Sequence, residues 1–138
     1  MRKSWDEYFL SIAREVATRS TCPRLSVGCV IVKDKHIIAT GYNGSIHGHE
    51  HCDEAGCLIN EAGRCIRTLH AEANAVLHAE RDHLKGATAY ITHEPCENCA
   101  KTLAQAGITR VVYSHAYPNP WNRHFLRDVE VVHLPLYS

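Results

Sequence analysis

The sequence has no long hydrophobic run and no excess of charge of either sign. No stretch approaches the roughly 18 apolar residues of a membrane span, and acidic residues begin at Asp6 without an apolar run of about 7–15 residues. We therefore expect neither a membrane partner nor a secretory signal. Fifteen Lys and Arg balance fifteen Asp and Glu, so broad electrostatic binding of nucleic acid is not expected. Apolar residues make up 45% of the chain, which is typical of a globular protein and excludes a disordered chain or a coiled coil.

Cysteine and histidine are abundant by contrast, with seven cysteines and eleven histidines among 138 residues. A chain of this length forms one domain. It buries roughly 68–70% of its unfolded surface without help from disulfides. An odd number of cysteines also excludes a fully paired disulfide framework. Without a secretory signal we expect a reducing cytoplasm, where cysteines serve metal binding or catalysis more often than disulfides.

The first third of the chain predicts a helix followed by a β-hairpin. Apolar residues recur at helical spacing over 4–19, and Ser4 with Glu7 three residues later has the pattern of a capping box. Two β-branched runs, 27–32 and 37–42, flank a turn at 33–35 and predict the hairpin. Residues 43–69 are rich in glycine and have little periodicity, so we expect a long irregular segment that is functional or tied down.

The second half alternates between helical and strand patterns. The predicted elements are a helix over 71–81, a strand over 87–92, a helix over 97–106, a strand over 109–113, a short helix around 125–126 and a strand over 129–132. A hairpin followed by alternating helices and strands indicates a three-layer α/β/α domain around a mixed five-stranded sheet. We expect this single domain to span residues 1–138.

The clearest chemical signal is His70-Ala71-Glu72 followed by Pro95-Cys96-Glu97-Asn98-Cys99. One imidazole and two thiolates give zinc three ligands and leave a fourth position for water, which is the catalytic arrangement. Cys96 and Cys99 lie on one face at the start of a helix, where the helix dipole favours thiolates. His70 begins its own helix. We therefore expect two helix N-termini to converge on one catalytic zinc.

Glu72 stands two residues from the predicted ligand His70, close enough to lie beside the metal without binding it. Zinc lowers the pKa of its water to about 7, and Glu72 can take that proton and return it to the substrate. This chemistry attacks an amidine-like carbon and expels ammonia, and the paired motifs are the signature of zinc nucleobase deaminases. A structural zinc knuckle or a redox pair are the alternatives for the Cys-x-x-Cys pair.

Nearly the whole chain resembles the deoxycytidylate (dCMP) deaminase family of the cytidine deaminase superfamily, most closely its bacterial and phage members with a cysteine-rich loop. The resemblance rests on the catalytic motifs and on further segments: 5–9, 27–32, 41–45 (Gly-Tyr-Asn-Gly-Ser), 70–75 and 90–92 before Pro95. It implies a cytidine-deaminase-like fold. It also implies zinc-dependent hydrolysis of dCMP to dUMP and ammonia, with a zinc-bound water as nucleophile, supplying dUMP for thymidylate synthesis.

The resemblance also implies contacts to the nucleotide. Asn43 would bind the deoxyribose, and the Ala71 backbone with the carbonyls near Thr92 and His93 would hold the amino edge of the base. Tyr117 would lie against the base or the phosphate. Donors for the 5′-phosphate are expected among Arg24, Ser26, Arg64, Arg67 and Asn74, since a guanidinium clamps phosphate with two hydrogen bonds.

Family resemblance further implies a homohexamer that dCTP activates and dTTP inhibits, with Mg²⁺ accompanying the triphosphate. The effector site is expected in the loop that contains Gly44, Ser45 and Gly48. The same chemistry on another substrate is the alternative function: cytidine, dCTP, a tRNA adenosine or a riboflavin precursor. A further alternative, from a different class, is a zinc-binding module without catalysis.

A second cysteine cluster comprises Cys22, Cys52, Cys57 and Cys65. The resemblance implies a structural zinc here, which would tie the irregular segment to the end of the first helix and contribute folding energy. His47 or His51 can replace one cysteine, and reduced thiols or a disulfide remain as alternatives. Cys29 is expected to be a buried apolar residue. Outside these motifs the histidines show no ligand spacing, and we expect them on the surface or in the core: His36, His78, His83, His115, His124 and His133.

Overall fold

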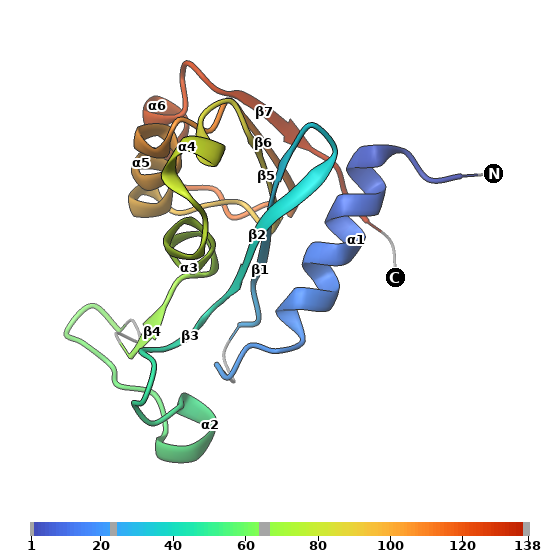
Figure 1. The fold of residues 1–138 in the computed structure, drawn as a ribbon. Helices are drawn as coiled ribbons and strands as arrows, with labels where there is room; N and C mark the ends of the chain where they lie inside the picture. Colours follow the sequence, from blue (N-terminus) through green and yellow to red (C-terminus); the bar gives the residue numbers. More distant parts are fainter. Residues whose placement is uncertain (1, 23–24, 64–66, 137–138) are drawn as a thin grey trace.

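A computed structural model describes residues 2–22, 25–63 and 67–136 of the chain (Figure 1). Its helices are α1 (Trp5–Ala17), α2 (Cys52–Ala55), α3 (Ala71–His78), α4 (Arg81–Leu84), α5 (Glu97–Ala106) and α6 (Asn122–Phe125). Its strands are β1 (Gly28–Lys33), β2 (His36–Tyr42), β3 (Gly44–Ser45), β4 (Thr68–Leu69), β5 (Thr88–His93), β6 (Arg110–His115) and β7 (Glu130–His133). Across these described ranges, every helix is too short or too polar to cross a membrane.

Five strands form one mixed sheet in the order β2-β1-β5-β6-β7. Strand β1 pairs antiparallel with both β2 and β5, whereas β5, β6 and β7 run parallel. Parallel neighbours need crossover connections, and α5 and α6 lie in the two connections here. The mixed five-stranded sheet predicted from the sequence is therefore confirmed.

Helices cover both faces of this sheet (Figure 1). On one face Phe9 and Leu10 of α1 pack against Val30. On the other face α3 and α5 enclose a second core that includes Ile31 and Ile91. Since successive side chains of a strand point to opposite faces, the neighbouring β1 residues Val30 and Ile31 belong to different cores. This arrangement confirms the three-layer α/β/α architecture.

Two glycines let helices lie directly on the sheet. A Cβ atom on Gly28 would collide with the carbonyl oxygen of Ala13 in α1. A Cβ atom on Gly41 would collide with the carbonyl oxygen of Ala71 and the backbone nitrogen of Ala75, both in α3. Neither glycine has a positive φ, so close approach is what requires glycine. Gly41 thus sets the distance between β2 and the first turns of α3.

The predicted helix over 71–81 is two helices. Helix α3 ends at His78, Ala79 has an extended backbone, and α4 begins at Arg81. The break changes the direction of the chain, so that Leu84 packs in the core at 3% exposure. Burial of this one leucine stabilises the fold by about 1.5–3 kcal/mol. Helical periodicity in the sequence does not reveal this contact, so the sequence predicted one continuous helix.

The irregular segment 43–69 is closed at its ends by a short pairing. Strands β3 and β4 run antiparallel, with Gly44 opposite Leu69 and Ser45 opposite Thr68. Between them, His51 caps α2, and its Nδ1 lies 3.1 Å from the Thr21 hydroxyl beyond the end of α1. The sequence predicts a segment that is tied down, and the β3–β4 pairing supplies one such tie directly before His70.

Candidate metal centre and active site

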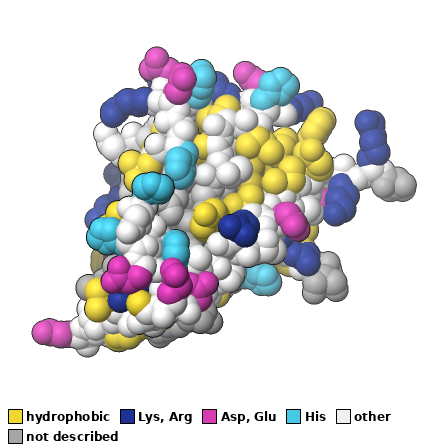
Figure 2. Space-filling model, turned by 60° about the horizontal axis from the view of Figure 1, so that its bottom comes forward, with side chains coloured by type: hydrophobic (Ala, Val, Ile, Leu, Met, Phe, Trp, Pro, Cys, Tyr) yellow, Lys and Arg dark blue, Asp and Glu magenta, His cyan; other side chains and the backbone are white. Residues whose placement is uncertain are grey.

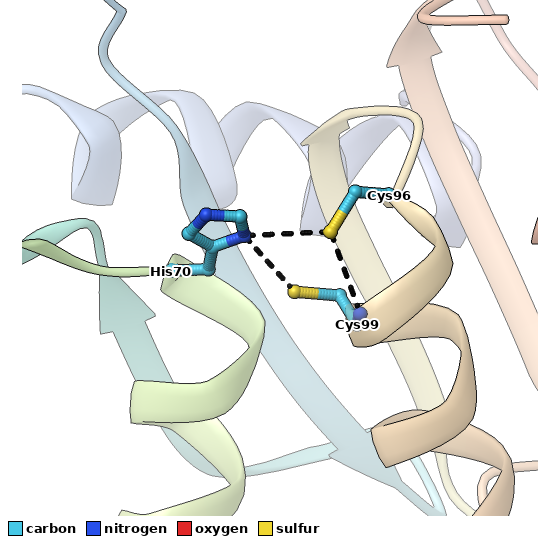
Figure 3. Close-up of side chains that lie close together, drawn as sticks. All are labelled: His70, Cys96 and Cys99. Carbon is cyan, nitrogen blue, oxygen red and sulfur yellow. Dashed lines mark hydrogen bonds between the residues drawn. The ribbon is translucent and has the colours of Figure 1, made fainter. Parts of the chain in front are cut away.

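Three predicted ligands meet where two helices begin. His70 is the N-cap residue of α3, and Cys96 is the N-cap residue of α5. The Cys96 sulfur accepts a hydrogen bond from the backbone N–H of Cys99 at 3.5 Å. Figure 3 shows the three side chains pointing toward one another from these two helix starts. The local sequence explains this, because an i, i+3 spacing places two side chains on one face of a helix.

The spacing of the ligand atoms fits one zinc ion. His70 Nδ1 lies 3.3 Å from the Cys99 sulfur and 3.5 Å from the Cys96 sulfur, and all three ligand atoms lie within 4.8 Å of one another. Tetrahedral zinc, with bonds of about 2.0–2.1 Å to nitrogen and about 2.3 Å to sulfur, separates such atoms by about 3.5 Å. The side chains thus form a preorganised site for zinc, with Nδ1 as the ligand nitrogen of His70.

The pKa values of the two thiols are shifted in opposite directions. A hydrogen bond from the Cys99 side chain, supported by the His70 ring, lowers the pKa of Cys96 to about 3. The same hydrogen bond and burial raise the pKa of Cys99. A thiolate is the form of cysteine that binds zinc. The thiolate form of Cys96 is therefore favoured, and a zinc ion held here would displace the proton of Cys99.

Glu72 lies in the first turn of α3, at 4% exposure, and lines the same cavity as the three ligands. Burial raises the pKa of its carboxyl group, because desolvation disfavours the charged form. A carboxyl group whose pKa is raised in this way binds a proton more readily than an ordinary carboxylate, and so can accept and release one during a reaction cycle. This is the behaviour expected of the acid–base residue.

The site opens into a cavity of about 800 Å³. Four residues singled out from the sequence for substrate contact line it: Asn43, Ala71, His93 and Tyr117. Glu72 and the predicted metal ligands His70 and Cys96 line it as well. The rest of its described lining consists of apolar, amide and acidic residues with one hydroxyl, Thr68, and one thiol, Cys22, and contains neither Lys nor Arg. On the face drawn in Figure 2, Lys and Arg are scattered among acidic and histidine side chains.

Two of the predicted contact residues also hold the backbone of the cavity in place. The Asn43 side chain accepts from the Val27 N–H at 2.9 Å and donates to the Leu25 carbonyl at 2.6 Å. Thr92 is buried, and its hydroxyl accepts from the Gly28 N–H at 3.1 Å and lies 2.8 Å from His93 Nδ1. Burial lowers the pKa of His93, with a smaller effect from neighbouring charge. Its neutral ring is therefore favoured at the cavity.

Other predicted contacts lie elsewhere. Asn74 donates to the Tyr42 carbonyl at 2.8 Å, and neither it nor the exposed Ser26 is part of the described lining. Arg67 donates to the Gly56 carbonyl and pairs with Glu50 at 3.3 Å, so it holds the irregular segment. The remaining phosphate candidates, Arg24 and Arg64, lie outside the described residues.

The second cysteine cluster is partly described. Cys22 and Cys52 are buried and Cys57 is half-buried, whereas Cys65 lies outside the described residues. Within the described ranges, His70, Cys96 and Cys99 are the one set of potential ligands close enough to share an ion. His47 is exposed. Of the predicted effector residues, Gly44 and Ser45 form β3, while Gly48 is exposed with a φ of 87°.

The lining residues that the sequence prediction did not single out include Glu94, Asn119 and Trp121. Glu94 precedes Pro95 in the metal motif, where it looks like part of a strand end. Asn119 and Trp121 belong to a segment without helical or strand periodicity. The available signal was compositional, since a Tyr-Pro-Asn-Pro-Trp run after a buried strand marks a loop at the edge of the sheet, where ligands bind.

Comparisons with known proteins agree with this geometry. The protein-family model for the cytidine and deoxycytidylate deaminase zinc-binding region matches residues 3–115 of this chain. ComE operon protein 2 of Bacillus subtilis is 50% identical over 118 residues, which cover 84% of this chain and 62% of that protein. The deoxycytidylate deaminase of Mycobacterium phage D29 is 45% identical over 123 residues, which cover 81% of this chain and 95% of the phage protein.

A solved structure extends the likeness to nearly the full length. The crystal structure of dCMP deaminase from the cyanophage S-TIM5 in complex with dCMP and dUMP has a TM-score of 0.81 and 32% identity, and covers 97% of this chain and 99% of that one. The family model covers most of the chain, including His70, Cys96 and Cys99. The chain therefore belongs to the cytidine and deoxycytidylate deaminase family.

Proposed function

We propose that this chain, as a single domain over residues 1–138, catalyses the zinc-dependent hydrolysis of dCMP to dUMP and ammonia. One observation carries the proposal: Glu72 is buried in the cavity onto which His70, Cys96 and Cys99 converge. Bound there, zinc supplies Lewis-acid activation of water near neutral pH. Likeness to dCMP deaminases over nearly the full chain selects the pyrimidine nucleotide as substrate.

Proton transfer is the work of Glu72. Its carboxylate accepts a proton from the water that attacks C4 of the cytosine ring and delivers that proton to N3. It then moves the second proton of the water to the exocyclic amino group, which leaves as ammonia. Atoms balance, because water is consumed and its oxygen becomes O4 of the product uracil ring. The nucleotide is held by Asn43, the Ala71 backbone, the carbonyls near Thr92 and His93, and Tyr117.

The proposed phosphate contacts are adjacent in sequence to two lining residues. Leu25 and Gly63 line the cavity, and their sequence neighbours Arg24 and Arg64 are the guanidinium donors proposed for the 5′-phosphate. A nucleotide monophosphate needs such cations, since a bidentate Arg–phosphate pair provides both charge and orientation. Arg24→Ala and Arg64→Ala should raise KM for dCMP and leave deoxycytidine hydrolysis unchanged.

A substrate panel tests the proposal. Ammonia release should be fastest with dCMP and far slower with deoxycytidine, dCTP, a tRNA adenosine or a riboflavin precursor. Arg127→Ala is the matched control for the Arg24 and Arg64 variants, because Arg127 is exposed and contacts the nearby His124. A preference for any other compound in the panel rejects dCMP as the substrate. Absence of ammonia release from every compound, in protein that contains zinc, rejects the enzyme in favour of a binding module.

Regulation and assembly form a finer part of the proposal. We propose a cytoplasmic homohexamer that dCTP activates and dTTP inhibits, with Mg²⁺ on the triphosphate and contacts from Gly44, Ser45 and Gly48. Support comes from the family resemblance of the Gly-Tyr-Asn-Gly-Ser stretch. The test is a dCMP assay with each triphosphate, with and without Mg²⁺, beside light scattering for the mass. Identical rates with and without the triphosphates, or a monomer mass, reject it.

A structural zinc completes the proposal. Its ligands are Cys22, Cys52, Cys57 and Cys65, and His47 or His51 can replace one of them. The closeness of His51 to Thr21, at 3.1 Å, supports the idea that the irregular segment is fastened to the end of α1. Metal analysis should find two zinc ions per chain, and Cys57→Ser should reduce this to one without removing the catalytic ion. One zinc in the unmodified protein rejects the second site.

A further inference from the structure

Glu94 is a buried carboxylate that the proposed reaction does not use. Its side chain is 7% exposed, although it lines the cavity. The backbone N–H of Glu94 donates to the His115 carbonyl at 2.8 Å, which extends the pairing of β5 and β6 beyond their ends. Burying a charge is costly unless partners compensate it. The partners of this carboxylate therefore indicate what it does.

Those partners all follow β6 in the chain. One carboxylate oxygen accepts from the backbone N–H of Tyr117 at 3.0 Å. The other accepts from the side-chain amide of Asn122 at 2.8 Å and lies 3.6 Å from the guanidinium of Arg123. Residues 117–122, which include four lining residues, form the wall segment of the cavity. A single carboxylate thus binds both ends of the wall segment.

Pro95 continues the same attachment toward the metal motif. Its carbonyl accepts from the amide groups of Asn122, at 3.0 Å, and Asn119, at 3.3 Å. Both hydrogens of the Asn122 amide are thereby used, and Asn122 itself is 1% exposed. The next residue in sequence is the ligand Cys96. The wall segment is therefore fastened to the two residues that precede a metal ligand.

The wall segment places two aromatic side chains on the cavity. Tyr117 and Trp121 line it and are 51% and 54% exposed. Flat aromatic faces beside a polar centre are suited to a planar ring, because stacking and apolar burial add to its binding. Their positions relative to the centre depend on the bonds that Glu94 makes.

We propose that Glu94 is a positioning residue: it holds the wall segment, and with it Tyr117 and Trp121, at the distance from the metal ligands that a pyrimidine ring requires. This inference rests on the proposed function for its choice of ring. A carboxylate suits the role because it offers two acceptor oxygens and no donor. Replacement by glutamine keeps the shape but turns a donor toward Asn122 or the Tyr117 N–H.

The experiment uses kinetics together with a probe of the wall segment. The chain has two tryptophans, so in a Trp5→Phe background the fluorescence comes from Trp121. Glu94→Gln, Glu94→Ala and Asn122→Ala are made in this background. Each protein is measured for dCMP kinetics, zinc content and quenching of Trp121 by acrylamide. Glu80→Gln is the matched control, because Glu80 is an 81% exposed carboxylate in the α4 region.

Loss of one charged hydrogen bond in Glu94→Gln should raise KM about tenfold and leave kcat within about twofold. Glu94→Ala should raise KM further. The acrylamide quenching constant should rise in the same order, while zinc content stays at the level of the background protein. Asn122→Ala removes a partner of Glu94 from the other side, so it should reproduce the kinetic pattern of Glu94→Gln. If Glu94→Ala fails to fold, Glu94→Gln and Asn122→Ala decide whether Glu94 positions the wall segment.

Unchanged KM and quenching in Glu94→Gln overturn the proposal. So does a fall in kcat with loss of zinc at constant KM, because Glu94 would then act on the ligand Cys96 alone. The proposed function fails in a different way, through absence of dCMP hydrolysis in the background protein. The quenching series then still decides whether Glu94 holds the wall segment.

Discussion

Replacement of Gly41 by alanine is a sharp test of how the fold positions the catalytic groups. A Cβ atom at this position collides with the Ala71 carbonyl oxygen and the Ala75 nitrogen and lies 2.9 Å from the Ala75 Cα. Ordinary van der Waals contact begins at 3.4 Å, so even this third contact requires a shift of about 0.5 Å. Backbone atoms of a helix cannot rotate away, and therefore α3 must move from β2 as a body.

That movement carries His70 and Glu72 with it. Zinc–ligand distances tolerate about ±0.2 Å, and a misplacement of about 1 Å can cost 10²-fold in rate. A shift of half that size should lower kcat/KM for dCMP about tenfold and weaken zinc binding in competition with a chelator. Overpacking should also lower the free energy of unfolding by about 1–3 kcal/mol.

Gly86→Ala is the control for the Gly41 substitution. Gly86 has a φ of 80° and open space around its Cα, so alanine should cost about 1 kcal/mol of backbone strain without moving α3. Its zinc affinity and kinetics should therefore equal those of the unmodified protein. Zinc affinity and kcat/KM at the unmodified level in Gly41→Ala would refute the reasoning, because α3 would then not depend on that close approach.

Two further predictions concern the first helix. The Asp6 carboxylate accepts from both Arg110 terminal nitrogens at 2.7 Å and from the Tyr90 hydroxyl at 2.8 Å, so Asp6→Asn should cost about 2 kcal/mol at pH 7, measured by urea denaturation. The hydrogen bond from Arg110 lowers the pKa of Asp6 in the folded state. The stabilisation by Asp6 is therefore complete above the unfolded pKa of about 3.9 and is lost as pH falls through the lower folded pKa. The difference in stability between the two proteins should begin to shrink below about pH 4 and vanish below the folded pKa. A pH-independent difference contradicts this. Ser4 caps α1 by accepting from the Glu7 N–H at 3.1 Å, so Ser4→Ala should cost about 1 kcal/mol and Ser4→Asp should restore it, whereas equal losses in both would exclude capping.

The meeting of His70, Cys96 and Cys99 was predictable because the signal is local. His70 and the Cys96–Cys99 pair each begin a helix, and residue type with helical spacing suffices to place them. The sheet was predictable for a similar reason, since a hairpin followed by alternating helices and strands has few arrangements. Ser4 was predicted as a cap, although the Glu7 side chain accepts from the Ser4 hydroxyl rather than from its backbone N–H.

Features that depend on contacts between distant segments were not predictable. Glu94 and Asn122 lie 28 residues apart, and their hydrogen bond exists because β5 and β6 end side by side. The break at Ala79 likewise depends on the place that Leu84 finds in the core. The orientation of the His70 ring was not predictable either. The sequence identifies the residue, but the nitrogen that faces the sulfurs depends on how the folded chain places the ring.

The most direct test of the central claim is the hydrolysis of dCMP by Glu72→Gln, measured together with zinc content. Glutamine keeps the size of the side chain but cannot carry a proton between water and N3. General acid–base catalysis contributes about 10²–10⁴-fold. We therefore predict a fall in kcat of at least that order with one catalytic zinc still bound to His70, Cys96 and Cys99. Full activity in zinc-containing Glu72→Gln would contradict the account.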